Sequence, residues 1–301
     1  HGSFHPNRMM IVGTAAPPFA TVQDLGRVGF RDSGVPVSGV ADRDSALALN
    51  AMLGNDPNAA MIEWALAGGA LQFDRACTVA IGGAEVACAI DGRAVAPFTP
   101  FEASAGGQLV VSRIIRGRFL LVAVSGGVDV PVVLGSRSTL ISASIGGLDG
   151  RRLKTGDVLP VGNLRASSAQ PARSIDNPGR TFASNDAIHV MRGPQADMFD
   201  ERAWATFLNT ELVVSRASDR TGYRLEGAEL QHSGSAALPS EPTCLGAIQV
   251  PNGGAPIVLM NDGPTIGGYP KIAVIRAAHF SRFAQLAPGD KVRFALDETP
   301  D

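Results

Sequence analysis

Long apolar stretches are missing from this 301-residue chain. A membrane-spanning helix needs about 20 consecutive apolar residues. The best candidate, Phe119 to Leu134, is interrupted by two glycines, by Asp129 and by Pro131. The opening eight residues also lack the apolar core of a signal peptide. We therefore expect a soluble, cytoplasmic protein that does not act at a membrane.

Cysteine is scarce, and its three copies do not cluster. Cys77, Cys88 and Cys244 stand far apart, each within apolar sequence. An odd number of scattered cysteines forms neither a disulfide framework nor a metal-ligand pattern. We expect all three to be buried free thiols in a reducing compartment.

The short motifs that mark common enzyme classes are also absent. The sequence contains no GxxxxGKS/T, no GxGxxG after a strand, no HExxH and no CxxC, and its five histidines are scattered. Ser125 lacks the glycine two residues before it that a nucleophile elbow uses. These absences exclude a P-loop, a dinucleotide fingerprint and a serine-hydrolase elbow, and they predict no bound metal.

Neither sign of charge dominates. Lys and Arg together number 26 against 28 Asp and Glu, which gives a formal net charge of -2. Overall charge therefore predicts neither a nucleic-acid footprint nor an attachment to anionic membranes. Only 3 of the cations are lysines, so a lysine at an unusual position carries more weight than an arginine.

What the sequence does contain is a series of short apolar runs with turn dipeptides between them. This pattern is typical of β sandwiches and β barrels. Dipeptides such as Gly82-Gly83 and Arg116-Gly117 supply residues that tolerate the positive φ of tight turns. The strands predicted in this way are Thr78–Ile81, Val86–Ile90, Leu109–Ser112, Phe119–Val124 and Val128–Leu134.

Helices are predicted to be few. The stretch from Asp42 to Leu53 starts with a capping aspartate, carries apolar residues near every third or fourth position and ends before Gly54. A second helix is predicted from about Pro194 to Leu208, and a short third one from Ala278 to Leu286. The fold class predicted is mainly β, with a few short helices.

A polar stretch between Gly162 and Arg180 divides the chain and is typical of a linker. A similar phrase stands near the end of each of the two parts of the chain that the polar stretch separates: LKTGDVLP at 153–160 and LAPGDKVR at 286–293. Each predicts a Gly-Asp turn before a last strand, so the two halves are either related units or use a common turn twice. We predict an N-terminal β-barrel unit at 9–162, a linker or crossing at 163–181 and a C-terminal β-barrel unit at 182–297.

Polar side chains gather among glycines and prolines between Thr21 and Asp42. A helix that starts at Asp42 offers backbone N–H groups that favour an anion, so Asp24, Arg27 and Asp42 are candidates for a ligand site. The alternative is a surface loop in which Asp42 only caps the helix. Arg27 carries less weight because arginine is the usual cation of this chain.

Four further stretches carry candidate site residues. Lys271 follows Tyr269 and a proline at the start of an apolar strand, where an ammonium group can stabilise negative charge on a substrate oxygen; the alternative is a solvated strand-end lysine. Arg137 and the cluster at 218–226 are either ligand contacts or structural networks of arginine with carboxylates. Glu63 is either a paired structural acid or a general base whose pKa burial raises.

Seven phrases together resemble a known family. They are TVQDLGRVGF, GVPVSGVAD, LGSRST, SDRTGYRLEG, GAIQVPNGGAPIVL, GGYPKIAVI and QLAPGDKVRF, in this order. The sequence resembles the allophanate hydrolase subunit 2 family, also called the biotin-dependent carboxyltransferase family, from about Ile11 to Leu296. This family includes the C subunit of ATP-dependent 5-oxoprolinase.

The resemblance implies two cyclophilin-like β-barrel units and a heteromeric complex with a protein like the B subunit of 5-oxoprolinase and with a third, A-type subunit. It implies a complex that hydrolyses 5-oxo-L-proline to L-glutamate, with ATP as co-substrate and with activity only in the complex. One alternative is a carboxyltransferase module that uses carboxybiotin on urea or another amide. Another is a non-catalytic regulator that binds a kinase-inhibitor-like partner. One phrase departs from the family pattern, because Asn261-Asp-Gly-Pro-Thr265 stands where an arginine and a glutamine are expected.

Both enzymatic interpretations need fixed positive charges or N–H donors around a planar N–C=O group. We hypothesise that Arg27, Arg137 and Lys271 provide the positive charge. The carboxylate of Asp42 or Glu63 would accept a proton, and Tyr269 and Gln249 would position the amide.

Overall fold

The computed structural model describes residues 10–15, 19–162, 186–232 and 238–297, and it divides the chain into two compact units. The first unit holds the described residues up to 28 and those from 38 to 162. The second holds Gly29–Val37 and the described residues from 186 onward. Sequence analysis had assigned 29–37 to the N-terminal unit. The predicted linker at 163–181 and the opening eight residues lie outside the described ranges, and each unit is described by itself below.

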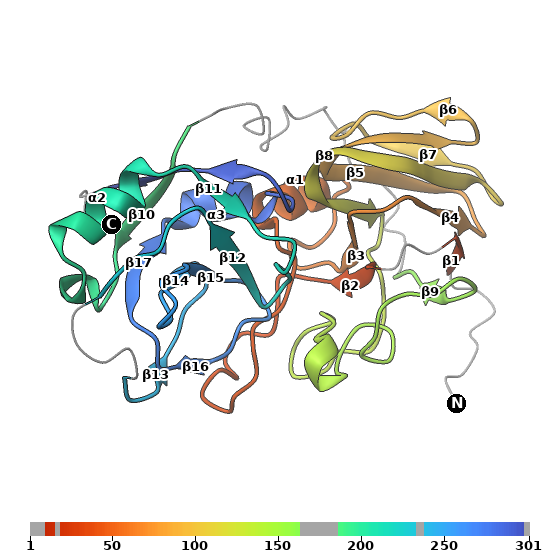
Figure 1. Cartoon of the computed structure of the whole chain (residues 1–301). Coiled ribbons are helices and arrows are strands. Elements are labelled where there is room, and N and C mark those ends of the chain that lie inside the picture. The colour runs from red at the N-terminus through yellow and green to blue at the C-terminus, as the bar shows by residue number, and fades with distance from the viewer. Residues whose placement is uncertain (1–9, 16–18, 163–185, 233–237, 298–301) are drawn as a thin grey trace. The chain divides into compact units, whose positions relative to one another are not determined.

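The first unit is built on a nine-stranded antiparallel sheet (Figure 1). Its main path runs β2-β3-β8-β4-β1-β9, and β5 pairs with β6, β7 and β8. The bounds are β1 Met10–Ala15, β2 Thr21–Gln23, β3 Met61–Ala65, β4 Gly69–Phe73, β5 Cys77–Ile90, β6 Arg93–Ala94, β7 Phe101–Ala103, β8 Gln108–Val124 and β9 Val158–Pro160.

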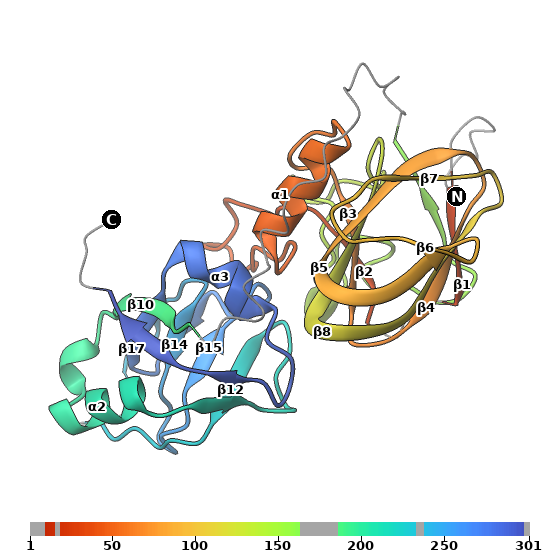
Figure 2. The ribbon, with the colours of Figure 1, turned by 90° about the horizontal axis from the view of Figure 1, so that it is seen from above.

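Two long strands, β5 and β8, shape this unit. They pair antiparallel over nearly their whole length, with register shifts around Glu85 and between Ala87 and Cys88. Such bulges bend a strand and increase its twist. Figure 2 shows both strands curving around the unit. The predicted β-rich fold is confirmed, with sheets that curl toward barrels.

The turns predicted at Gly82-Gly83 and Arg116-Gly117 are wrong, because these residues continue β5 and β8. Glycine is needed at 82 for another reason: a Cβ there would lie 2.6 Å from the Phe98 ring. The predicted strand Val128–Leu134 is also wrong. That stretch is a loop that ends in a tight turn, in which Leu134 has a φ of 51°.

The helix predicted after Asp42 is confirmed. Helix α1, Arg43–Met52, packs its apolar side chains against β5 and β8. The Asp42 carboxylate caps it by accepting hydrogen bonds from the Ser45 backbone N–H at 3.0 Å and from the Ser45 hydroxyl at 2.7 Å. A short 3-10 helix, η1 Ile141–Ala143, lies in the loop between β8 and β9.

The second unit is an eight-stranded sheet in the order β18-β11-β12-β15-β14-β17-β10-β19 (Figure 1). Its pairs are antiparallel except β10 with β19, which is parallel. A separate two-stranded sheet joins β13 and β16. The bounds are β10 Ile188–Arg192, β11 Leu212–Val214, β12 Gly222–Glu226, β13 Glu241–Pro242, β14 Ala247–Gln249, β15 Ile257–Leu259, β16 Ile266–Gly267, β17 Lys271–Ile275, β18 Lys291–Val292 and β19 Phe294–Leu296.

Helices α2, Glu201–Asn209, and α3, Ala277–Ala284, belong to this unit. The prediction placed the start of α2 near Pro194, whereas the helix begins after the capping Asp200, and a 3-10 turn, η3 Ala196–Met198, precedes it. Among the described residues, no helix has the length and apolar composition to cross a membrane.

The two Gly-Asp phrases form the same turn. The Asp157 carboxylate accepts from the Lys154 backbone N–H at 2.7 Å, and the Asp290 carboxylate accepts from the Ala287 N–H at 2.8 Å. In addition, the Asp157 N–H donates to the Lys154 carbonyl, and the Asp290 N–H donates to the Ala287 carbonyl. A strand follows in each case, β9 or β18, so the turn predicted twice from sequence is confirmed twice.

The cysteine prediction is right for two residues and wrong for one. Cys77 and Cys88 are buried free thiols in the core of the first unit, while Cys244 is exposed. Cys244 lies in the turn between β13 and β14, where the chain reverses at the surface. Its apolar neighbours in sequence therefore did not indicate burial.

Candidate functional site

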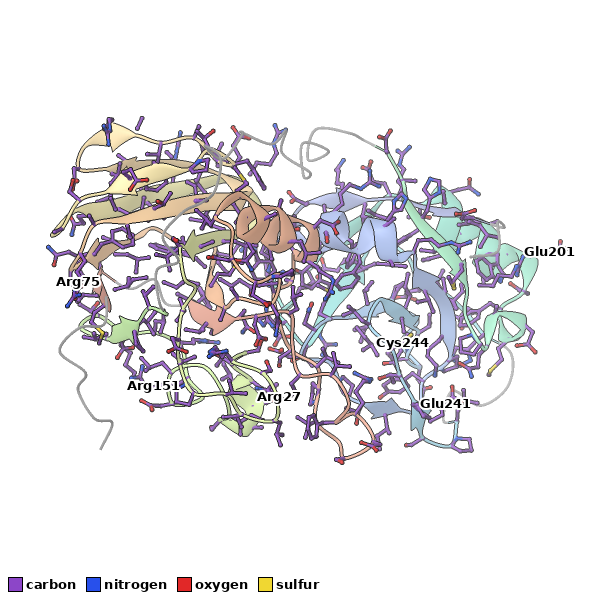
Figure 3. All side chains as sticks on the ribbon, turned by 180° about the vertical axis from the view of Figure 1, so that it is seen from behind. Arg27, Arg75, Arg151, Glu201, Glu241 and Cys244 are labelled. Carbon is purple, nitrogen blue, oxygen red and sulfur yellow. The ribbon has the colours of Figure 1, made fainter. Side chains whose placement is uncertain are left out.

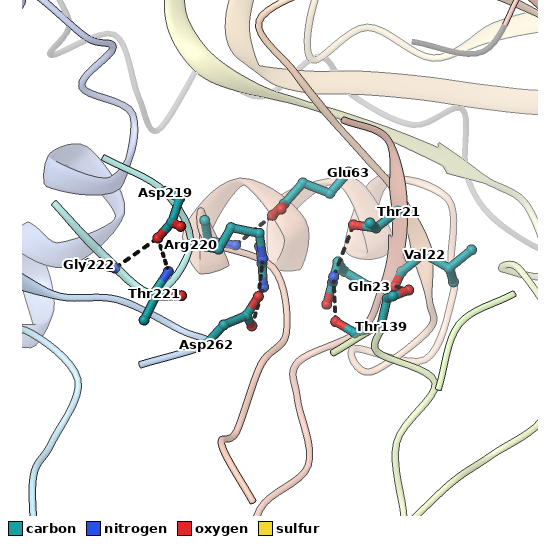
Figure 4. Close-up of polar contacts among 11 residues, drawn as sticks. Thr21, Val22, Gln23, Glu63, Thr139, Asp219, Arg220, Thr221, Gly222 and Asp262 are labelled. Carbon is teal, nitrogen blue, oxygen red and sulfur yellow. Dashed lines mark hydrogen bonds and ion pairs between the residues drawn. The ribbon is translucent and has the colours of Figure 1, made fainter. Parts of the chain in front are cut away.

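Asp24 organises a network of hydroxyl and N–H groups in the first unit. One carboxylate oxygen accepts from the hydroxyls of Ser136 and Ser138 at 2.6 and 2.5 Å, and the other accepts from the Arg137 backbone N–H at 2.6 Å. Gln23, the preceding residue, donates from Nε2 to the Thr139 carbonyl at 3.1 Å (Figure 4). These bonds fix the loop between β8 and β9 to the end of β2.

The guanidinium groups of Arg27 and Arg137 hold the same loop. Arg27 is fully buried and donates to the carbonyls of Ser138 at 2.6 Å and Val133 at 3.4 Å. Arg137 is partly exposed, donates to the Val130 carbonyl at 3.0 Å and pairs with Asp129 at 2.7 Å. Both cations thus have contacts inside the loop, and their role in substrate binding stays a prediction.

Asp42 and Glu63, the two predicted proton acceptors, are both 2% exposed. Asp42 caps α1, as described above. The Glu63 carboxylate accepts from the Ala41 backbone N–H at 2.7 Å, which ties β3 to the residue just before the cap. Both carboxylates therefore hold the backbone at the start of α1, one at Ala41 and one at Ser45. Their catalytic role stays a prediction.

Lys271 carries a buried positive charge in the second unit. Its side chain is only 3% exposed, and Nζ lies 2.6 Å from a carboxylate oxygen of Glu241. Nζ also donates to the Tyr269 carbonyl at 3.4 Å. The alternative of a solvated strand-end lysine is wrong, because burying an ammonium group requires a charged or strongly polar partner.

Gln249 lies beside Lys271, because the two residues face each other in the β14–β17 pair. The register shifts between Ile248 and Gln249, so the pair stands at a bulge, where Ile272 is the extra residue of β17. Gln249 is 4% exposed, and its Nε2 has no hydrogen-bond partner among the described residues. The sequence-predicted pair of Lys271 and Gln249 is thus brought together by the register of two strands.

Gly267 lets this amide lie against the backbone of β16. A Cβ on Gly267 would lie 2.7 Å from Gln249 Nε2, closer than any real side chain allows. Gly267 is in turn the register partner of Glu241 in the β13–β16 sheet. Tyr269, predicted to position an amide, is 45% exposed, and its carbonyl accepts from Lys271 Nζ.

Glu241 and Gln195 were not among the residues predicted from the sequence. The Gln195 side-chain amide donates to Glu241 at 2.7 Å, and its oxygen accepts from the Lys271 backbone N–H at 3.2 Å. The hydrogen bond from Lys271, followed by that from Gln195, lowers the pKa of the Glu241 carboxyl below its usual value. Glu241 follows a polar stretch and Gln195 follows Pro194 near an expected helix start, so no local pattern indicated either residue.

Arg31 and Cys244 extend this polar region. Arg31 donates to the Thr243 carbonyl at 2.8 Å and to its hydroxyl at 3.0 Å, within the second unit. Glu241 and Cys244 are labelled in Figure 3. Although Cys244 is exposed as a residue, burial around the thiol raises its pKa, and the positive charges of Arg31 and Lys271 offset part of that effect.

In the charged cluster at 218–226, an arginine and two aspartates make contacts within the second unit, and a role in ligand binding stays a prediction. Arg220 forms a two-point ion pair with Asp262, at 2.9 and 3.1 Å, and Asp219 accepts from the Thr221 N–H at 2.8 Å (Figure 4). Asp262 belongs to the phrase that departs from the family pattern. Its carboxylate holds Arg220, which lies just before β12. Among the described residues, no group of three or more His, Cys, Asp or Glu could hold a metal ion.

The second unit therefore offers a fixed ammonium group and a side-chain N–H donor side by side, which suits an oxygen-rich planar ligand. Comparison with known proteins decides the family: residues 33–296 match the carboxyltransferase domain, subdomain A and B. The chain belongs to this carboxyltransferase family. The resemblance seen in seven phrases of the sequence is confirmed.

Two groups of relatives share this domain. The chain is 37% identical to the C subunit of 5-oxoprolinase from Escherichia coli over 276 residues, which is 92% of this chain and 87% of that protein. It is 32% identical to urea amidolyase of Saccharomyces cerevisiae over 91% of this chain but only 16% of that protein. The crystal structure of Kluyveromyces lactis urea amidolyase superposes with a TM-score of 0.89 at 31% identity, over 97% of this chain and 19% of that one. The carboxyltransferase family thus includes relatives of this chain's own size and much larger ones.

Proposed function

We propose that this carboxyltransferase-family chain is the C subunit of an ATP-dependent 5-oxoprolinase complex, which hydrolyses 5-oxo-L-proline to L-glutamate with a B-type partner and an A-type subunit. The observation that carries the proposal is the match to the E. coli 5-oxoprolinase C subunit, which covers 87% of that protein at 37% identity. The match to urea amidolyases covers only 16% of their length.

The chemistry of a lactam agrees with the polar groups of the second unit. In the proposed reaction, the lactam oxygen attacks the γ-phosphoryl group of ATP and ADP leaves. Water then adds to the activated carbon and the C–N bond breaks, with the proton going to nitrogen, which gives γ-glutamyl phosphate. A second water hydrolyses this acyl phosphate to glutamate and phosphate. Donors fixed around such a group are each worth about 3 kcal/mol in a site shielded from water. In the second unit, Lys271 supplies a fixed positive charge to the substrate, and Gln249 supplies an N–H donor to the lactam oxygen.

The proposal is tested in the reconstituted complex by measuring ADP release with 5-oxoproline. We expect turnover with all subunits present and none with this chain alone. Lys271→Met should lower turnover at least tenfold, about 1.4 kcal/mol in barrier. Lys291→Met is the matched control, because Lys291 is another of the three lysines but its side chain is 68% exposed. A complex that binds its partners but releases no ADP would reject the proposal, and an unchanged rate in Lys271→Met would remove this lysine from it.

A second candidate function is carboxyl transfer from carboxybiotin to urea or another amide. The TM-score of 0.89 against K. lactis urea amidolyase favours it, because the whole fold of this chain is shared with that protein. Biotin would then be required as a cofactor carried by another protein. This function predicts bicarbonate- and urea-dependent ADP release when a biotin carboxylase and a biotinylated carrier are added, and no response to 5-oxoproline.

A further inference from the structure

We propose that Lys271 and Gln195 form a subsite for the carboxylate of a small lactam acid, that Gln249 donates to its lactam oxygen, and that the Glu241 side chain competes with the substrate for the carboxylate subsite. The identity of the ligand rests on the proposed function. The competition between Glu241 and a ligand carboxylate rests on the geometry of the second unit alone.

Four residues form a closed set of neighbours. Gln249 faces Lys271 across β14 and β17. Lys271 Nζ contacts Glu241 at 2.6 Å. Glu241 faces Gly267 across β13 and β16, and Gln249 Nε2 lies against Gly267, 2.7 Å from where a Cβ would stand. Each of the four residues is thus a neighbour of two others. The donor groups of Lys271 and Gln249 therefore lie in the same region of the second unit.

Glu241 is held less firmly than the cation it contacts. Lys271 belongs to a central strand and is 3% exposed at its side chain, whereas the Glu241 side chain is 39% exposed. Glu241 belongs to a separate sheet of two strands with only two residue pairs. Lys271 is therefore the fixed part of the ion pair, and Glu241 is the part that can move away.

Only another anion can replace Glu241 without leaving a buried charge uncompensated. One oxygen of Glu241 accepts both from Lys271 Nζ and from the Gln195 amide, which is the bonding that a ligand carboxylate would inherit. Gln249 Nε2 has no partner among the described residues and remains as a donor for a neutral carbonyl. A small molecule with a carboxylate and an amide oxygen on one ring matches this set of donors.

The test measures binding to the full chain by titration calorimetry, with 5-oxo-L-proline and 2-pyrrolidinone as probes. The second probe has the same lactam ring without the carboxylate. We expect Glu241→Gln to bind 5-oxoproline at least tenfold more tightly than the unchanged chain and to bind 2-pyrrolidinone with unchanged affinity. Gly267→Ala should weaken 5-oxoproline binding, because its Cβ would meet the Gln249 amide.

Glu211→Gln is the matched control. Glu211 also lies 2.6 Å from a lysine of the second unit, Lys291, but that lysine is exposed. Removing the Glu211 charge should leave the affinity for both probes unchanged. If Glu241→Gln fails to fold, Glu241→Asp keeps the charge on a shorter side chain, and a smaller gain in 5-oxoproline affinity is expected. Fluorescence of Trp204 in α2 reports folding of this unit.

Unchanged or weaker 5-oxoproline binding in a folded Glu241 variant would overturn the inference, and so would an equal gain for 2-pyrrolidinone. The outcome is separate from that of the proposed function. Tighter 5-oxoproline binding by Glu241→Gln without ADP release in the complex would keep the subsite and reject the 5-oxoprolinase reaction. ADP release without any change in binding would do the reverse.

Discussion

A buried ammonium group determines the chemistry of the residues around it more strictly than an exposed one does. Lys271 is one of three lysines in the chain, and it is buried against a carboxylate, a carbonyl and a side-chain amide. Removing one partner of such a pair leaves the other charge without compensation. Substitutions at Glu241 are therefore informative about Lys271 even where no substrate is present.

Thiol reactivity should separate the three cysteines of the native protein. Burial is the main cause that raises the pKa of Cys77 to about 12 and of Cys88 to about 11. Cys244 is exposed, and its pKa is raised above the usual thiol value. Because the thiolate is the reactive form, its alkylation should become faster as the pH increases toward this raised pKa. Iodoacetamide should modify one cysteine per folded chain and all three in urea, as measured by mass spectrometry of peptides.

Cys244→Ser is the control for this experiment and should abolish modification of the folded chain. Modification of Cys77 before unfolding would contradict the burial of the first-unit core, because thiolate formation and access are both required.

Sequence was most informative about residues whose type is rare. Lys271 could be predicted because lysine is unusual in this chain and precedes an apolar strand. Glu241 and Gln195 could not, because their importance comes from contacts 30 and 76 positions away from Lys271 in sequence. Glu241 is also one of 28 acidic residues, so its type carried no signal.

At the scale of elements, α1 begins at a residue that has two possible roles. Asp42 caps the helix, and it is also a candidate proton acceptor. The cap needs a hydrogen-bond acceptor of the right length, which Asn supplies as well as Asp, whereas accepting a proton needs a carboxylate. The two roles therefore respond differently to the same pair of substitutions.

We expect Asp42→Ala to lower the free energy of unfolding of the first unit by about 1 kcal/mol, because the Ser45 N–H loses its acceptor. Asp42→Asn should change it by no more than a few tenths of a kcal/mol. Urea unfolding in a Trp204→Phe background measures this, since Trp64 in β3 is then the only tryptophan. If Asp42→Asn also keeps full ADP release in the complex, the residue serves the helix and not the reaction.

The elements that could be predicted are those with an unambiguous end signal. Helix α1 has a capping aspartate and a following glycine, and both boundaries were close to those observed. The dipeptides Gly82-Gly83 in β5 and Arg116-Gly117 in β8 were misread, because glycine serves both turns and bulges. Here it permits bulged, curved strands, and Gly82 also lies beside the Phe98 ring. Local composition does not separate these two uses of glycine.

At the scale of the whole molecule, the two-unit organisation was visible in a repeated phrase. The Gly-Asp turns before β9 and β18 have matching hydrogen bonds, so the repetition in sequence reflects a repetition in structure. The excursion of Gly29–Val37 into the second unit was not visible. Its attachment depends on the Arg31 side chain and not on strand periodicity, and a single arginine among 26 basic residues gives no signal.

This excursion should contribute to the stability of the second unit. Arg31→Ala removes charged hydrogen bonds to Thr243, which are worth about 1.5 kcal/mol or more in such settings. We expect the unfolding midpoint reported by Trp204 in a Trp64→Phe background to shift to lower urea. Arg216→Ala, at an exposed arginine of the same unit, should leave the midpoint in place. Equal midpoints for both variants would show that the excursion adds nothing to this unit.

The path of residues 29–37 also limits where recombination can divide the gene. Because the second unit takes nine residues from within the first, no single recombination point separates the two cleanly. A gene rearrangement that moves either one intact has to move both. The relatives agree with this: the matched region is 92% of this chain in a bacterial relative and 93% of it in the urea amidolyase of Lachancea kluyveri, where it forms 16% of a much longer polypeptide. In these relatives the two units therefore occur together.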